Sequence, residues 1–185
     1  ALACAQRVSD AVTEIGLLRP LYDRLSAIDA TGADPEAAFY LSRTLDGYRR
    51  AGVDRDEAVR ARIAELEQQI TASALAFQNN INGGRLEITA RPDELEGLPA
   101  DYVANHPPGE DGRVRISTDY PDLVPVMSYA TSEDLRRRLF TANLNRAPEN
   151  APILAEMLAR RHEQAQSLGH ADFAHLITED KMIGS

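Results

Sequence analysis

Residues 57–84, EAVRARIAELEQQITASALAFQNNINGG, contain the strongest secondary-structure signal of the sequence. Large apolar residues recur in it at steps of three, four and seven, at Val59, Ile63, Leu66, Ile70, Phe77 and Ile81. This apolar stripe predicts a long amphipathic helix that packs against other helices of the same chain. Asp54 and Glu57 indicate a capping box at its start, and Asn82-Gly83-Gly84 indicate its end.

Two further helices are expected before this stretch. The first follows an apolar period of three and four, formed by Val8, Val12, Ile15, Leu18, Leu21, Leu25 and Ile28. Residues 31–35, TGADP, interrupt it because glycine and proline break helices. A second helix is predicted from Glu36 to Arg50, and Gly52 ends it.

The pattern changes after Gly84. Apolar and polar residues alternate around Leu86 and Ile88 and again around Val114 and Ile116, which predicts a small β ribbon within a β insert at about residues 85–118. Between its strands, Pro92 to Leu98 indicates a short helix that Gly97 closes.

Helical period resumes towards the C-terminus. A helix is predicted from Thr131, a candidate cap, to about Arg146. Asn150 is a candidate cap for the next helix, which Gly169 ends, and a last one begins near Ala171. The buried face of the helix after Asn150 is expected to contain Ile153, Leu154, Met157, Leu158, Ala165 and Leu168. The predicted fold class is mainly α, an antiparallel helical bundle with a small antiparallel β insert, truncated at both ends.

Composition narrows the function classes. The chain has 185 residues, 43% of them hydrophobic, and a formal charge of −9, so it can bury a core but repels a phosphate backbone. The basic runs at 136–138 and 160–161 lie beside acids in helical segments, as on a solvated helix face. No apolar run is long enough to span a bilayer, and Cys4 is the only cysteine. We therefore expect a soluble, cytoplasmic protein without nucleic-acid or membrane partners.

No catalytic residue can be assigned from the residues alone. The four histidines, His106, His162, His170 and His175, include no His-Glu-x-x-His pair that would place two imidazoles around one zinc ion. Cys4 has no histidine near it in sequence. Acidic residues are abundant, but abundance does not identify an acid and base pair. We predict no catalytic, no cofactor-binding and no metal-binding residue in this chain.

The order of several motifs resembles one enzyme family over about residues 40–182. The motifs are YRRAGVD at 48–54, ELEGLP at 94–99, YPDLVPVM at 120–127, and a series that runs from Arg146-Ala147 through Leu168-Gly169 to Lys181-Met182. They resemble the zinc metallopeptidase family of thimet oligopeptidase, oligopeptidase A and peptidyl-dipeptidase. The sequence departs from the family at His170, where an aromatic residue commonly follows Leu-Gly, and at Ala159, where the family often has Leu.

The resemblance implies a non-catalytic N-terminal fragment of a zinc-dependent oligopeptidase. Residues 1–130 would be an N-terminal helical region with the β insert, and residues 131–185 the first helices leading into a missing catalytic domain. The chain would form a scaffold and one wall of the substrate channel for short peptides. Zinc, the only cofactor implied, would belong to the missing domain, since the family's His-Glu-x-x-His helix lies beyond the equivalent of residue 182.

Two alternatives stay open on the sequence alone. One is an independent helical enzyme whose site no motif identifies, and the other is a binding module. The stripe from Val59 to Ile81 would suit a coiled-coil or adaptor module that binds a partner protein equally well. In that case its apolar face would be exposed rather than packed within the chain.

Overall fold

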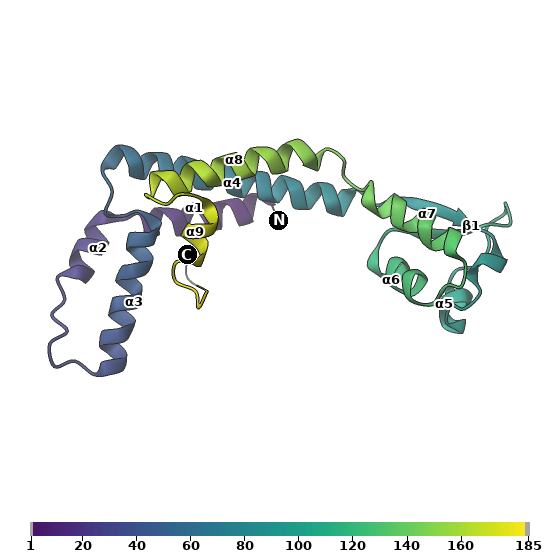
Figure 1. The fold of residues 1–185 in the computed structure, drawn as a ribbon, viewed down its shortest axis with the longest axis horizontal. Coiled ribbons are helices and arrows are strands. Elements are labelled where there is room, and N and C mark those ends of the chain that lie inside the picture. The colour runs from purple at the N-terminus through teal and green to yellow at the C-terminus, as the bar shows by residue number, and fades with distance from the viewer. Residues whose placement is uncertain (1, 184–185) are drawn as a thin grey trace. The chain divides into compact units, whose positions relative to one another are not determined.

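A computed structural model of the chain describes residues 2–183. It is mainly helical, with one two-stranded antiparallel sheet, as predicted (Figure 1). The chain forms two compact units. The helical unit comprises the described residues up to Ala76 together with those from Pro152, and the ribbon unit is Phe77–Ala151. The boundary predicted between residues 130 and 131 falls inside the ribbon unit.

The helical unit is built along the long helix that residues 57–84 predict, α4 (Glu57–Gly83). Helix α8 (Asn150–Ser167) runs antiparallel to α4, since Arg62 pairs with Glu163 while Arg160 bonds Ser73 (Figure 1). Helix α1 (Leu2–Gly16) is also antiparallel to α4, and Ser9 bonds Thr71 between them. The predicted antiparallel bundle is therefore confirmed.

The stripe of α4 is buried within its own chain over its first half. Ile63, Leu66 and Ile70 are buried, whereas Phe77 and Ile81 are only half-buried. The cap of α4 lies two residues beyond the predicted one, because Asp56 rather than Asp54 accepts the Val59 N–H. A helix whose stripe is already covered is a poor candidate for partner binding through that stripe.

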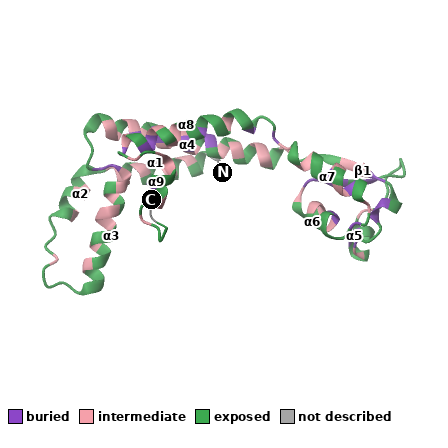
Figure 2. Ribbon diagram, in the orientation of Figure 1, coloured by how far each residue is buried: buried purple, intermediate pink, exposed green. Residues whose placement is uncertain are grey.

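The single helix predicted from Val8 to Ile28 is wrong. Residues 17 and 18 are not helical, so the predicted helix is interrupted there. Helix α2 (Arg19–Ser26) follows with Pro20 in its first turn, where proline costs no hydrogen bond. On α1, Val8, Val12 and Ile15 are exposed, so this helix is mostly green and pink in Figure 2.

Helix α3 (Pro35–Ala51) ends at Gly52 as predicted. Gly52 has a φ of +93°, which glycine adopts without strain. A Cβ at this position would lie 2.6 Å from Ile63 Cδ1 and 2.7 Å from Leu168 Cδ2. The glycine therefore both ends α3 and admits two core side chains.

The ribbon unit contains the predicted ribbon. Strands β1 (Glu87–Ala90) and β2 (Val114–Ser117) are antiparallel, with Ile88 opposite Ile116. A 3-10 turn, Pro92–Leu95, and a helix that was not predicted, α5 (Ala100–Asn105), lie between the strands. Gly97, with a φ of +92°, separates the two, and a Cβ there would meet the carbonyl oxygen of Tyr129 at 2.3 Å.

Helix α6 (Tyr120–Tyr129) was also missed, because Pro121 and Pro125 suggest a loop. Pro121 occupies the first turn, where its lack of an N–H is harmless, and Pro125 removes one internal hydrogen bond. Helix α7 (Glu133–Leu144) follows, and its cap is Ser132, which accepts the Leu135 N–H, rather than Thr131.

The core of the ribbon unit gathers residues from both strands, the 3-10 turn and helices α5, α6 and α7, together with residues between them. Its buried members are Ala90, Leu95, Leu98, Tyr102, Val114, Ile116, Val126, Ala130, Leu135 and Leu139. Beside it, Arg138 of α7 reaches the buried Glu94 carboxylate at 2.5 Å and the carbonyl oxygen of Thr89 at 2.7 Å. The β insert and the helices after it therefore form one packed body.

The C-terminal helices correct two expectations and agree with the predicted start of the last helix near Ala171. Asn150 is not a cap: its amide donates to the carbonyl oxygen of Phe77 at 3.0 Å and accepts from Asn80 at 2.9 Å. Leu154 and Leu158 of α8 are exposed. The last helix, α9 (Phe173–Thr178), begins after its cap Asp172. No helix within residues 2–183 is both long and apolar enough to cross a membrane.

Candidate functional site

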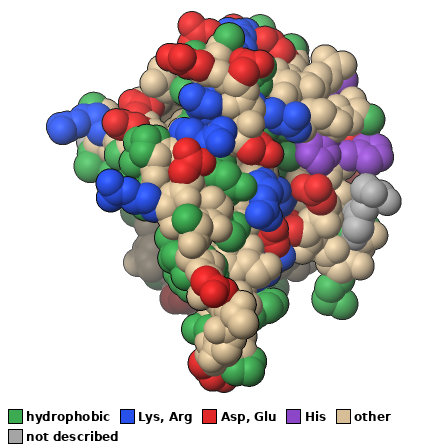
Figure 3. Space-filling view, turned by 90° about the vertical axis from the view of Figure 1, so that its left-hand side faces the viewer, with side chains coloured by type: hydrophobic (Ala, Val, Ile, Leu, Met, Phe, Trp, Pro, Cys, Tyr) green, Lys and Arg blue, Asp and Glu red, His purple; other side chains and the backbone are tan. Residues whose placement is uncertain are grey.

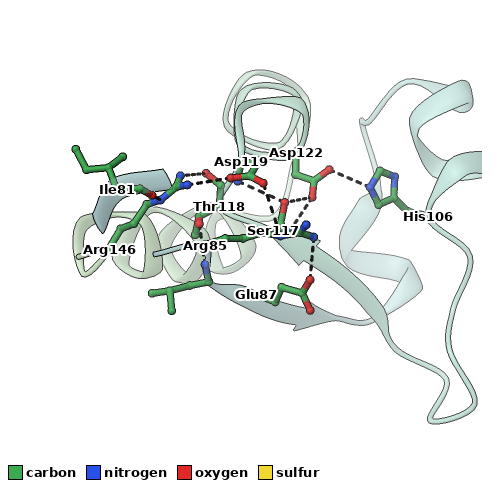
Figure 4. Close-up of polar contacts among 10 residues, drawn as sticks. Ile81, Arg85, Glu87, His106, Ser117, Thr118, Asp119, Asp122 and Arg146 are labelled. Atoms are coloured by element: carbon green, nitrogen blue, oxygen red, sulfur yellow. Dashed lines mark hydrogen bonds and ion pairs between the residues drawn. The ribbon is translucent and has the colours of Figure 1, made fainter. Parts of the chain in front are cut away.

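The densest polar cluster of the ribbon unit lies where β2 ends and α6 begins (Figure 4). Arg146, in the loop after α7, donates to the carbonyl oxygen of Ile81 at 2.8 Å and to that of Thr118 at 3.2 Å. It also reaches Asp119 Oδ1 at 3.0 Å. One guanidinium thus joins the last turn of α4, the end of β2 and the start of α6.

Asp122 is the second centre of this cluster. Its Oδ2 accepts from the Ser117 N–H at 2.7 Å and from Ser117 Oγ at 2.5 Å, and its Oδ1 lies 3.0 Å from His106 Nε2. Burial by itself raises the pKa of Asp122, but the hydrogen bonds from Ser117 and His106 outweigh burial and lower it. The carboxylate is therefore held in its charged form.

His106 and Tyr102 stack beside this carboxylate. Their ring centroids are 4.1 Å apart, and His106 Nδ1 lies 2.8 Å from the carbonyl oxygen of Tyr102. Burial raises the pKa of Tyr102, and the nearby charge of Asp122 adds to the effect. The Tyr102 hydroxyl oxygen is buried without a hydrogen-bond partner among the described residues.

Ser117, Asp122 and His106 together do not form a nucleophile with its base. The aspartate lies between the other two, so the imidazole contacts Asp122 and not the hydroxyl that would attack. Ser117 is 4% exposed, and its Oγ donates to the carboxylate. This arrangement positions α5, β2 and α6 relative to one another, and it offers no route for acyl transfer.

The other three histidines do not join this cluster. His162 is exposed on α8. His170 lies 3.9 Å from Glu179, and His175 contacts Asp172 at 2.8 Å next to the start of α9. No sequence pattern indicates that His106 would contact Asp122, because the two are 16 residues apart across a loop and a strand.

The residues do not fit a zinc ion. Within the part of the chain that the structure describes, no three residues among His, Cys, Asp and Glu converge as possible ligands. A catalytic zinc takes three protein ligands, so we derive no chemical step through a metal in this chain.

Four of the five arginines in the two basic runs, all except Arg161, form hydrogen bonds or ion pairs within the protein. Arg137 pairs with Glu133, Arg138 with Glu94 and Asp134, and Arg160 with Glu156. On the face shown in Figure 3, basic and acidic side chains are interspersed rather than gathered into one basic patch. Neither run resembles a phosphate-binding surface.

Comparison with known proteins gives a consistent result. Residues 126–185 match the model of peptidase family M3. Saccharolysin of Saccharomyces cerevisiae is 29% identical over 159 residues, which are 83% of this chain and 22% of saccharolysin. The thimet-like oligopeptidase of Dictyostelium discoideum is 30% identical over 149 residues, 79% of this chain and 22% of that protein.

Oligopeptidase A of Salmonella typhimurium is also similar, at 25% identity over 158 residues, 77% of this chain and 23% of the bacterial protein. The chain therefore spans about a fifth of the length of the curated relatives it matches. The resemblance noted in the sequence is confirmed.

Proposed function

Because the chain is related to the oligopeptidases of peptidase family M3, we propose that it is the non-catalytic N-terminal part of a zinc-dependent oligopeptidase acting on short peptides. In this proposal it forms a scaffold and one wall of the substrate channel. Its partners are the catalytic domain that follows it and the peptides that the intact enzyme cleaves.

The observation that carries this proposal is the length of the alignments. Most of this chain aligns with about a fifth of each oligopeptidase, so it corresponds to one part of those proteins. The proposal divides the chain near residue 131 into an N-terminal region and the lead into a catalytic domain, a division of role that lies within the packed ribbon unit. The match to the family model begins nearby, at residue 126.

The sequence supports a division of labour between this part and the rest. It contains no His-Glu-x-x-His, the motif with which two histidines on one helix face hold zinc beside a glutamate base. Zinc would lower the pKa of a bound water and polarise the peptide carbonyl, and this chemistry is assigned to the domain beyond residue 185.

The test compares this chain with the longer product of the same coding region. Both proteins are dialysed, analysed for metal, and assayed with a quenched fluorescent peptide in the presence of zinc. We expect chelator-sensitive cleavage and about one zinc per chain only for the longer protein. Stoichiometric zinc with cleavage by the 185-residue chain would contradict the proposal.

A separate measurement addresses the channel wall. A short peptide carrying a photo-crosslinker is bound to the longer protein, irradiated and mapped by mass spectrometry. Crosslinks within residues 1–185 are expected. Crosslinks confined to residues after 185 would contradict the proposal that this chain forms a wall of the substrate channel, and only the scaffold role would remain.

We also propose that the intact protein works in the cytoplasm. The only cysteine, Cys4, is free and exposed, which suits a reducing compartment. Cell fractionation with an antibody to this chain tests the location. Recovery in an organelle fraction would contradict it, and one relative is named a mitochondrial intermediate peptidase.

A further inference from the structure

The helical unit has a half-open cavity of about 630 Å³ between its helices. Its walls come from α1, α3, α4, α8 and α9 and the residues that follow them, and they are mainly apolar, with Leu17, Ile63, Ile70, Leu168, Phe173 and Leu176 among them. Protein interiors are close-packed and contain few voids larger than a water molecule. The volume lies within the roughly 300–1,000 Å³ of small-molecule sites, which are also apolar with a few polar groups.

Most polar side chains on the cavity wall already have partners. Arg50 bonds the carbonyl oxygen of Leu176 and pairs with Glu179 and Asp180. Glu67 accepts a hydrogen bond from the buried Gln164. These contacts tie the helices around the cavity together.

Arg161 is the one charged side chain of this wall without a polar partner among the described residues. It lies on the cavity wall and is half-buried, with its guanidinium 5.1 Å from the centre of the Phe173 ring. The Arg161 guanidinium has no hydrogen bond or ion pair with any residue between 2 and 183. The chain carries 29 acidic residues, so a half-buried arginine without a carboxylate is conspicuous.

We propose that this cavity binds an apolar carboxylate, with Arg161 holding the carboxylate and the apolar wall covering the hydrocarbon part. The guanidinium fork matches a carboxylate in two parallel hydrogen bonds, and Phe173 keeps the guanidinium plane in place. A medium-chain fatty acid and the C-terminal residue of an apolar peptide both have this chemistry. The proposal does not depend on the peptidase assignment.

The experiment is isothermal titration of the full chain with two matched pairs of probes. The first pair is octanoate and octanamide, and the second is N-acetyl-phenylalanine and its amide. We expect the acid to bind at least about tenfold more tightly than the amide in one pair or both. Preference in the octanoate pair identifies a fatty acid site, and preference in the phenylalanine pair a peptide C-terminus.

Arg161→Gln removes the charge and should bring the affinity ratio of acid to amide close to one. Arg24→Gln is the matched control, since Arg24 is exposed on α2 and does not line the cavity. Circular dichroism and a thermal melt establish that both variants fold.

A second variant keeps the test independent of Arg161. A Cβ on Gly16 would lie 3.8 Å from Ala51 Cβ, and both residues line the cavity, so Gly16→Leu should fill part of it. This variant also favours the helix, and it should weaken acid and amide alike. The proposal fails if neither acid binds, if acid and amide bind equally, or if both variants bind as the wild type does.

Discussion

The helical unit has the longer helices, whereas the ribbon unit has the larger core. Among the described residues, the buried cluster of the helical unit consists of Ile63, Ala165, Leu168 and Leu176. That of the ribbon unit has ten buried members, drawn from short strands, short helices and turns. A regular apolar period therefore predicts where helices form, but it does not predict how much apolar surface those helices bury.

The difference has a physical origin. Long helices present wide apolar stripes, and the helical unit leaves Val8, Val12 and Ile15 of α1 exposed and a cavity open between its helices. The elements of the ribbon unit are too short to be stable alone, so they form only when many of them pack on one another. Substitutions at matched positions in the two units test this difference in packing.

The largest effect is expected in the core of the ribbon unit. Leu139→Ala should lower the free energy of unfolding by roughly 2–5 kcal/mol, because Leu139 is fully buried and the change leaves a cavity. Leu144→Ala on the same helix is the control, since Leu144 is 66% exposed. Urea titration measures both, and equal losses would show that the α7 core face is wrongly assigned.

The next effect separates two adjacent arginines of α7. Arg138→Ala should cost about 3 kcal/mol, because it leaves the buried Glu94 carboxylate without its partner. Arg137→Ala removes only the exposed pair with Glu133 and should change stability by less than about 0.5 kcal/mol. A double-mutant cycle with Glu94→Gln measures the coupling free energy between Arg138 and Glu94. A coupling free energy near zero would contradict the expected stabilisation by this pair.

A smaller and pH-dependent effect is expected at Asp122. Asp122→Asn should cost about 1 kcal/mol at neutral pH, since the amide accepts the Ser117 and His106 hydrogen bonds less well than a carboxylate. The pKa of Asp122 is lowered in the fold, so this stabilisation is complete above the ordinary aspartate pKa and is lost as pH falls through the lowered value.

The difference between wild type and Asp122→Asn should therefore shrink as the pH is lowered in thermal melts. Asp101→Asn, on the exposed side of α5, serves as the control. A difference that grows in acid would reverse the sign and contradict the assigned hydrogen bonds.

The smallest effect is expected on α1. Val8→Ala should change the free energy of unfolding by less than about 0.5 kcal/mol, because Val8 is 57% exposed despite its place in a regular apolar period. Leu66→Ala, at a fully buried position of the α4 stripe, should cost roughly 2–5 kcal/mol. A large loss of unfolding free energy in Val8→Ala would contradict the exposure of Val8 and would mean that the apolar period by itself predicts burial in the helical unit.

Sequence reasoning found the long helix, the ribbon and the ends at Gly52 and Gly97, because each depends on local backbone preferences. It missed α6, where Pro121 and Pro125 suggested a loop, and it placed the caps of α4 and α7 at neighbouring residues. Several short polar residues adjoin each helix start, and the final geometry selects one of them.

The candidate site was less accessible to the sequence than the fold. Arg146 and Asp122 were noticed only within family-like motifs, and nothing local indicated their partners. Arg146 bonds the carbonyl oxygen of Ile81, which is 65 residues away, and Asp122 meets His106 across 16 residues. Such contacts follow from how the elements pack, and no periodic pattern encodes them.

The sequence predicts the helical class of this protein, its β ribbon and its relation to the oligopeptidases, because apolar period, turn residues and motif order can be seen in the sequence itself. The tertiary structure shows which apolar faces are covered. It also shows that Asn150 bonds the backbone of α4 instead of capping α8, and that Arg161 lines a cavity without a carboxylate partner. Burial and hydrogen-bond satisfaction depend on residues distant along the chain, so they are settled only when the elements pack.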